Sequence, residues 1–289
     1  MRVLTLAFMV APWAAGQTLQ GVVDIHAHAD PDVVPRSIDA LSLVRLAKQR
    51  GLRGLVLKNH YEPTASLAWL ARQQTQGIEV FGGIALNRAV GGVNPAAVDR
   101  FAAVKGHYGR IVWMPTFDAE NQTKGQRPFV LVSKDGKLLP EVLEVLGIIA
   151  KHDLVMATGH SSPAENLLLI REAKLRGVKR LLVTHPLNKV IHMTVGQMKE
   201  AAAEGAYLEL VANGFIGNQA EMSAKDYAAA MRAVGFEHVV LASDFGQAGN
   251  PLHPDGLVMA FRALRAEGIP AEAIEIMTKR NPAKLLGLE

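Results

Sequence analysis

Cysteine is absent from this chain of 289 residues. Its absence excludes disulfides, thiolate metal sites and a cysteine nucleophile, so any metal ion must be held by nitrogen and oxygen ligands. A strong net charge is also missing: the chain has 31 lysines and arginines and 27 acidic residues, and its formal net charge is +4. Because the basic side chains are dispersed rather than gathered into a stripe with interleaved aromatic rings, nucleic acid is not an expected partner.

The chain also lacks a hydrophobic run long enough to cross a bilayer, for which about 20 residues are needed. Its N-terminal segment starts with one positive charge, continues with a short apolar stretch over residues 3–10, and has small residues up to Gly16. This pattern is typical of a secretory signal peptide over residues 1–16. The mature chain, residues 17–289, would then be periplasmic or secreted, and a short leader on a cytoplasmic enzyme is the alternative.

No Gly-x-Gly-x-x-Gly turn follows any apolar segment, which disfavours a doubly wound dinucleotide-binding sheet. What the sequence does contain is a series of short runs rich in Val, Ile and Leu, typical of strands buried on both faces of a parallel sheet. The hydrophobic share of 49% suits the core of one large domain. The expected strands are residues 22–28, 54–60, 80–87, 110–116, 154–160, 180–185, 206–213 and 238–244.

Segments with helical periodicity separate these strands, and most of them end at a glycine. They include residues 37–50, 63–76, 95–105, 194–204, 223–234 and 254–267. The segment after His160 begins with Ser162, Pro163 and Glu165, which form a capping box with proline at the first helical position. Eight strand–helix units in about 270 residues predict an α/β fold of the (β/α)₈ TIM-barrel type in a single domain. A doubly wound open sheet is the alternative.

The connection after the fourth strand, residues 116–140, is longer than the others. It contains an Asp-Gly pair at residues 135–136 with apolar residues on both sides, which predicts a β-hairpin. Because loops after barrel strands lie on the face that carries active sites, the hairpin is expected to form a lid or a substrate wall. A solvated insertion is the alternative.

Five side chains that commonly bind metals lie at the ends of expected strands. His26 and His28 are two residues apart, so in a strand both imidazoles project to the same side. His160, His185 and Asp244 each close a later apolar run. Since the C-terminal ends of barrel strands converge on one face, we expect these five side chains to meet around one centre.

Several imidazoles and one carboxylate, without a thiolate, suit one or two divalent ions, with zinc first and manganese as the alternative. Such an ion lowers the pKa of a bound water to roughly 7, which makes a nucleophile available at neutral pH. Asp244 is expected to accept the proton of the attacking water and to pass it to the leaving group.

The motifs at the ends of these strands resemble those of the amidohydrolase superfamily. The matching motifs, in chain order, are Asp-Ile-His-Ala-His at residues 24–28, Thr-Gly-His-Ser at 158–161, Val-Thr-His-Pro at 183–186, Ala-Ser-Asp-Phe at 242–245 and the closing residues 281–288. The resemblance covers the mature chain and implies a metal-dependent hydrolase with His26, His28, His160, His185 and Asp244 as matched positions. Residues 57–60, 82–87 and 91–92 are similar to those of a poorly characterised group of predicted metal-dependent hydrolases.

The fourth strand departs from this family pattern. Two-metal members usually carry a carboxylated lysine there, whereas residues 111–116 contain neither lysine nor glutamate. Lys58 instead ends the second strand, and we interpret it as an anchor for an anionic substrate; a carboxylated bridging ligand and a structural ion-pair partner are the alternatives. Arg36 could clamp a carboxylate through two hydrogen bonds, or be a surface arginine. The expected substrate-binding residues are Lys58, His60, Arg36 and Asn87.

Other polar residues, glycines and histidines near strand ends have less specific roles. Asn87, Asn213 and Asp118 could each contact a substrate or serve a turn. The glycine pairs at residues 82–83 and 91–92 are expected to permit tight backbone turns rather than to cradle phosphate. The remaining histidines are expected to be non-catalytic: His107, His152, His192, His238 and His253.

The leading hypothesis is therefore a hydrolase that uses a metal-activated water to cleave an amide, lactone or ester bond of a small molecule. In this hypothesis His26, His28 and Asp244 bind the ion with His160, and His185 either binds a second ion or polarises the substrate carbonyl. Asp244, His185 and Lys58 are catalytic. A decarboxylase or hydratase on the same barrel is the rival, since Lys58 and Arg36 would suit a substrate that carries a carboxylate. A non-catalytic metal-binding or scaffold protein is the third hypothesis, and the oligomeric state is left open.

Overall fold

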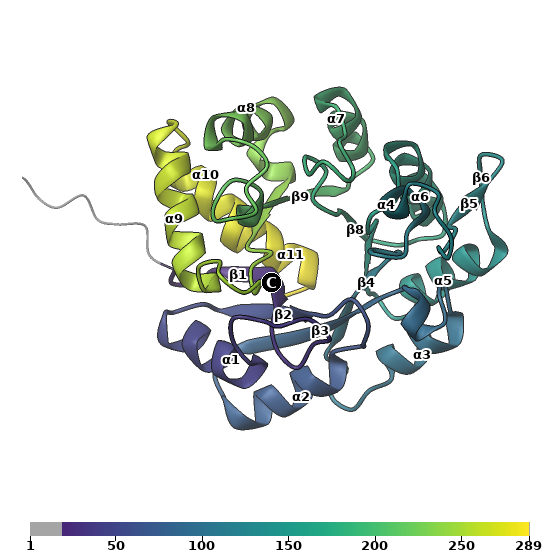
Figure 1. Cartoon of the computed structure of the whole chain (residues 1–289), viewed down its shortest axis with the longest axis horizontal. Helices are drawn as coiled ribbons and strands as arrows, with labels where there is room; N and C mark the ends of the chain where they lie inside the picture. Colours follow the sequence, from purple (N-terminus) through teal and green to yellow (C-terminus); the bar gives the residue numbers. More distant parts are fainter. Residues whose placement is uncertain (1–18, 289) are drawn as a thin grey trace, which may run out of the picture.

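Eight parallel strands form one sheet in the order in which they follow one another along the chain (Figure 1). The structure is a computed structural model that describes residues 19–288, so the predicted signal peptide lies outside the described residues. The strands are β1 (Val23–His28), β2 (Gly54–Lys58), β3 (Glu79–Ala85), β4 (Gly109–Trp113), β7 (Val155–Ala157), β8 (Arg180–Val183), β9 (Tyr207–Val211) and β10 (Val239–Ala242). Every predicted strand is present, and the (β/α)₈ barrel is confirmed.

Helices surround the barrel. The long ones are α1 (Ala40–Gln49), α2 (Ala65–Gln74), α3 (Pro95–Ala102), α5 (Pro140–Lys151), α6 (Pro163–Leu175), α7 (Val195–Ala203), α8 (Ala224–Val234) and α9 (His253–Ala266). Short helical segments are η1 (Arg88–Val90), α4 (Glu120–Thr123), η2 (Ala212–Gly214), η3 (Phe236–His238), α10 (Ala271–Glu275), η4 (Ile276–Arg280) and α11 (Asn281–Leu286). The predicted capping box starts α6, where Ser162 and Glu165 each accept the other's backbone N–H. Among the described residues no helix is both long and apolar enough to cross a membrane.

The barrel closes where β1 meets the segment that follows β10. The backbone N–H of Asp244 donates to the carbonyl of His26 at 2.9 Å, and the N–H of His28 donates to the carbonyl of Phe245 at 3.0 Å. We call this contact between β1 and the segment after β10 the seam of the barrel. The buried carboxylate of Asp24 supports the seam by accepting the N–H of Ser243 at 2.9 Å. This closure brings the two histidines at the start of the chain beside an aspartate about 220 residues later.

The barrel interior is filled by apolar side chains and is closed at its N-terminal end. Leu285 and Leu286 of α11 pack with Val23 and Ile25 of β1 in one buried cluster. The last helix therefore plugs the bottom of the barrel, near the centre of Figure 1. The opposite, C-terminal end remains for the functional site.

The expectation of tight turns at the glycine pairs was wrong for the first pair. Gly82 and Gly83 lie inside β3, and the indole of Trp113 occupies the space beside Gly83. A Cβ atom on Gly83 would lie 2.0 Å from Cζ3 of that indole, so no other residue fits there without a shift. Gly91 and Gly92 do form a turn, with φ angles of +89° and +72°.

The predicted hairpin is present as β5 (Ser133–Lys134) and β6 (Lys137–Leu138), with Asp135 at a φ of +52° in its turn. It lies at the periphery, beside α5 and α6 (Figure 1). The Ser133 hydroxyl donates to the Glu165 carboxylate at 2.8 Å and so ties the hairpin to α6. None of its residues lines the central cavity described below, so the expectation of a lid was wrong and the solvated alternative holds.

Candidate metal centre

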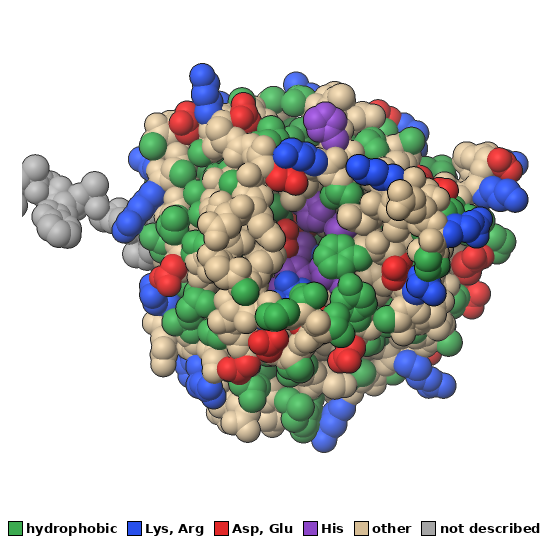
Figure 2. Space-filling model, viewed as in Figure 1, with side chains coloured by type: hydrophobic (Ala, Val, Ile, Leu, Met, Phe, Trp, Pro, Cys, Tyr) green, Lys and Arg blue, Asp and Glu red, His purple; other side chains and the backbone are tan. Residues whose placement is uncertain are grey.

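The C-terminal ends of the barrel strands open into a cavity of about 610 Å³. Histidine side chains gather in this hollow, at the centre of the face shown in Figure 2. All but one of the predicted site residues line it: His26, His28, Arg36, Lys58, His60, His160, His185 and Asp244. Asn87 is the exception, because its side chain is buried outside the lining.

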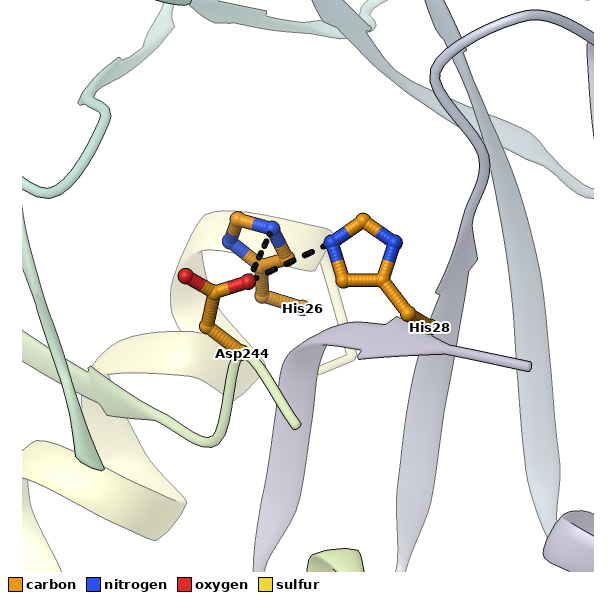
Figure 3. Close-up of side chains that lie close together, drawn as sticks. All are labelled: His26, His28 and Asp244. Atoms are coloured by element: carbon orange, nitrogen blue, oxygen red, sulfur yellow. Dashed lines mark ion pairs between the residues drawn. The ribbon is translucent and has the colours of Figure 1, made fainter. Parts of the chain in front are cut away.

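His26, His28 and Asp244 point toward one another at the seam of the barrel (Figure 3). Asp244 Oδ1 lies 3.1 Å from Nε2 of His26 and 3.2 Å from Nε2 of His28. A tetrahedral zinc ion with bonds of about 2.0–2.1 Å separates its ligand atoms by roughly 3.3 Å. Both distances to Asp244 Oδ1 therefore fit ligands of a single divalent ion, and all three ligand atoms lie within 4.8 Å of one another.

The protonation of the two imidazoles also fits a metal site. Burial lowers the pKa of both His26 and His28 well below 6.5, so both rings are neutral and keep a lone pair. Nδ1 of His26 lies 3.0 Å from Oε1 of Glu209, which places the ring proton on Nδ1 and leaves the Nε2 lone pair facing Asp244. Lone pairs of two nitrogens and one carboxylate oxygen thus face one another, an arrangement that a cation between them stabilises.

His160 and His185 lie in the same cavity but outside this group of three. Their ring centroids are 4.9 Å apart, and that of His185 is 6.1 Å from that of His26. Burial lowers the pKa of both rings, and Gln122 Oε1 holds His160 Nδ1 at 2.8 Å. His185 and Asp244 have φ angles of +22° and +52°, in a region that residues other than glycine seldom adopt.

Lys58 is buried between the histidines and the barrel interior. Its Nζ lies 2.9 Å from Nε2 of His26 and 4.9 Å from the centroid of the Trp113 ring. Burial lowers the pKa of Lys58 to about 8, although the charges of Asp244 and Glu209 oppose this shift. The lysine donates to the same nitrogen lone pair that an ion would use. Lys58 and a divalent ion therefore compete for His26 Nε2.

His60 forms the part of the cavity next to β4. Its ring stacks between His28 and Phe117, with centroid distances of 4.9 and 3.8 Å. Nδ1 of His60 lies 2.9 Å from the hydroxyl oxygen of Thr116. The buried carboxamide of Asn87 donates to the His60 carbonyl and to that hydroxyl, and accepts the Thr116 N–H. The side-chain contacts of Asn87 thus stay within the protein and position His60.

Arg36 lines the cavity as one half of an ion pair. Its Nε and Nη2 donate to Oδ2 of Asp32 at 2.8 and 2.6 Å, which fixes the guanidinium while other N–H groups remain for a ligand. Asn213 also lines the cavity, whereas Asp118 accepts the backbone N–H of Arg88 and serves a turn. Within the described part of the chain, the histidines expected to be non-catalytic do not line this cavity: His107, His152, His192, His238 and His253.

Sequence reasoning missed two buried carboxylates. Glu209 on β9 is fully buried and holds His26, and burial raises its pKa to about 7. Asp24 on β1 is buried at the barrel seam, and burial raises its pKa to about 6. The available signal was the acidic residue within each apolar run, because a carboxylate in a strand buried on both faces needs a nearby partner.

Three comparisons with known proteins bear on this site and its scaffold. The model of a family described as "Family of unknown function (DUF6282)" matches residues 21–209, about two thirds of the chain. That range includes β1, Lys58, His160, His185 and Glu209. A search of curated protein sequences found no match.

Solved structures share the fold at low sequence identity. An amidohydrolase from Pseudomonas aeruginosa is 16% identical, with a TM-score of 0.64 and coverage of 92% of this chain and 95% of that one. The organophosphorus hydrolase from Deinococcus radiodurans is 15% identical, with a TM-score of 0.62 and coverage of 97% and 100%. A 2,6-dihydroxybenzoate decarboxylase is 11% identical, with a TM-score of 0.56 and coverage of 93% and 99%. At these identities the likeness shows a shared fold, and the predicted resemblance is confirmed at that level.

Proposed function

We propose that this chain, which belongs to the DUF6282 family of unknown function, is a metal-dependent hydrolase that cleaves an amide, lactone or ester bond of a small molecule. The observation that carries the proposal is the convergence of His26, His28 and Asp244 at the C-terminal mouth of the barrel. Structural zinc sites usually have four protein ligands, whereas three ligands in an open cavity are typical of catalytic sites. The barrel face on which the group lies supports the same conclusion.

In this proposal the histidines and Asp244 bind the metal. His26, His28 and Asp244 would hold the ion, zinc first and manganese as the alternative, with His160 and His185 as candidates for a second one. When bound, the ion would polarise the substrate carbonyl and make water nucleophilic near neutral pH.

Proton transfer and charge stabilisation fall to this chain's own side chains. Oδ1 of Asp244 faces the two imidazoles, so its other oxygen is the group that takes a proton from the attacking water and returns it to the leaving atom. The ammonium of Lys58, at the same end of the cavity, would stabilise negative charge on the substrate oxygen. In the alternative in which His185 binds no second ion, it would donate its N–H to that oxygen.

A lyase reaction is the second candidate, because one structural neighbour is named a decarboxylase. The cations Lys58 and Arg36 line the cavity and would hold a substrate carboxylate. Product analysis separates the two reactions. Cleavage of the acyl bond with incorporation of ¹⁸O from labelled water supports hydrolysis. Incorporation without bond cleavage supports a hydratase, and release of carbon dioxide without incorporation supports a decarboxylase.

Elemental analysis of the purified protein tests the metal site. We expect about one ion per chain, lost in His26→Ala and Asp244→Ala because each removes one of only three ligands. His152→Ala is the matched control, since this histidine pairs with Asp99 away from the cavity. Absence of bound metal in the wild-type protein, even after reconstitution with zinc or manganese, would refute the proposal.

A Lys58→Met variant decides the role of the lysine. If Lys58 competes with the ion for His26, the variant keeps its metal and binds it more tightly. If Lys58 is instead carboxylated and bridges two ions, the wild type contains about two ions and the variant loses them. The second result would replace the anchoring role of Lys58 but would retain the hydrolase.

A further inference from the structure

Uncharged amide side chains form one wall of the cavity. Asn213, Asn218 and Gln219 come from the connection between β9 and α8, and Gln247 comes from the connection between β10 and α9; we call these four residues the amide wall. In Figure 2 tan surface, which is backbone and uncharged polar side chains, borders the hollow that holds the histidines. Gln247 joins the wall to the metal centre, because its amide donates to the backbone carbonyl of Asp244 at 2.8 Å.

The amide wall is held in place by a residue behind it. Asn250 donates to Oδ1 of Asn213 at 3.1 Å and to Oε1 of Gln247 at 3.3 Å, and its own oxygen accepts the backbone N–H of Asn218 at 2.8 Å. Asn213 in turn donates to Oε1 of Gln219 at 3.3 Å. The wall is thus organised before any ligand binds, which lowers the entropic cost of recognition.

The network leaves hydrogen-bonding groups of the wall unused. A carboxamide has two N–H donors and two acceptor lone pairs. Among the described residues, the side-chain oxygen of Asn218 and the side-chain nitrogen of Gln219 have no hydrogen-bond partner, and both residues are exposed to the cavity. The wall therefore offers both donors and acceptors to a ligand.

The chemistry of the wall selects among ligands. A phosphate or a second carboxylate would need a free cation beside the wall. The backbone of Arg36 pairs with that of Gln247, but its guanidinium is already paired with the Asp32 carboxylate. Lys189 lies on the exposed rim. An alkyl chain would cover the amides without pairing them, which is costly. A hydroxyl group both donates and accepts, and so matches a carboxamide.

We propose that the substrate is a small polyhydroxylated compound, with the carbonyl group that is hydrolysed at the metal centre and its hydroxyl groups on the amide wall. This inference rests on the proposed hydrolase function and adds the substrate class. With a polyhydroxylated lactone as the test substrate, water adds to the carbonyl carbon and the ring C–O bond breaks. The ring oxygen leaves with one proton as a hydroxyl group, and the product is the open-chain hydroxy acid.

A matched pair of lactones tests the inference by kinetics. Ribonolactone carries three hydroxyl groups on the skeleton of γ-valerolactone, which carries none. After division by the uncatalysed rates, we expect kcat/KM to favour ribonolactone by about 100-fold or more, because a site built to bind hydroxyl groups rejects analogues that lack them. In Gln219→Met and Asn218→Leu the preference should fall by about 10-fold each. Gln73→Met, exposed on α2, is the matched control and should keep the preference.

Binding of the open-chain products separates this inference from the proposed reaction. Calorimetry on the metal-loaded protein should show ribonate bound at least about 10-fold more tightly than 4-hydroxyvalerate, with the difference lost in Gln219→Met. That result without lactone turnover would uphold the substrate class and refute the hydrolysis. Turnover of both lactones with equal efficiency would uphold the hydrolysis and overturn the inference. Failure to bind ribonate, or a stronger response to a dipeptide, would also overturn it.

Discussion

His26 performs two tasks with its two ring nitrogens. Nδ1 faces the carboxylate of Glu209, and Nε2 faces Asp244 and Lys58. A carboxylate behind a metal-binding imidazole fixes its tautomer and raises its basicity. The sequence predicted the imidazole and its direction from the His-x-His spacing. It did not predict the carboxylate, because the pairing joins residues 183 positions apart.

A Glu209→Gln substitution tests this support. The amide keeps the shape of the side chain but removes the negative charge that holds the Nδ1 proton of His26, so we expect metal affinity to fall by about 10–100-fold. A competition titration with a chromophoric chelator measures the change. Glu144→Gln, exposed on α5, is the matched control. Equal affinities in the two variants would show that Glu209 does not support the metal site.

His253 gives a prediction about pH. It is buried at the start of α9, and burial lowers its pKa from 6.5 to about 4, with the nearby backbone of Phe245 and His28 opposing the shift. Because the folded-state pKa is the lower one, the unfolded chain takes up the proton first as the pH falls. This histidine therefore destabilises the fold progressively from pH 6.5 down to about 4, by roughly 3 kcal/mol in total.

Urea unfolding of metal-free wild type and His253→Leu at pH 7 and pH 4.5 measures this contribution. We expect wild type to lose more stability than the variant over this interval. Comparing the two cancels the opposite contributions of Asp24 and Glu209, whose raised pKa values favour folding at low pH. Equal losses would contradict the prediction.

At the scale of elements, the contact between β3 and β4 shows how one strand makes room for another. Trp113 at the end of β4 is fully buried beneath Lys58, and Gly83 on β3 provides the space for its indole. The sequence contains both residues, but it does not show that their strands pair in this register. For this reason Gly83 was predicted to be a turn residue.

A Gly83→Ala substitution should therefore destabilise the barrel. Its Cβ would lie 2.0 Å from the Trp113 ring, and relief of such overpacking typically costs about 1–3 kcal/mol. Gly147→Ala in α5 is the control, because a Cβ there meets no atom within 4 Å and alanine favours a helix by up to about 1 kcal/mol. Unfolding in urea measures both changes, and a neutral Gly83→Ala would show that the indole moves freely.

At the scale of the whole molecule, the proposed metal centre lies at the closing seam of the barrel. His26 and His28 belong to the first strand, and Asp244 follows the last. An ion bound to all three would tie the two ends of the sheet together. It would bind only the folded chain, since the unfolded chain does not bring these residues together.

Metal removal should accordingly lower the melting temperature. An ion at 100 times its Kd stabilises the folded state by about 2.7 kcal/mol. For a domain of this size that corresponds to several degrees, at about 2–4 °C per kcal/mol. Calorimetry with and without a chelator measures the shift, and His26→Ala should show none. An equal shift in His26→Ala would place the stabilising ion elsewhere.

The location of the protein remains a prediction from its first residues. We propose that residues 1–16 are removed on export, so that the mature chain begins at Gln17. Mass spectrometry of the N-terminal peptide from the native host tests this proposal. A peptide that retains Met1 and the apolar stretch would favour the cytoplasmic alternative.

The sequence by itself determined the barrel and most of the candidate centre. Eight apolar runs punctuated by capping residues and glycines dictate the order of strands and helices. In a parallel barrel, residues that end successive strands must meet on one face. His26, His28 and Asp244 could therefore be assigned to one site before their distances were known.

Only the tertiary structure decided which groups act together. It placed Glu209 behind His26 and turned the Asn87 side chain toward His60 and Thr116 rather than into the cavity. It also placed the hairpin at the periphery and assembled the amide wall from two separate loops. Periodicity shows which residues are buried or end a strand. Pairings between distant residues depend on strand register and side-chain packing, which local sequence patterns do not specify.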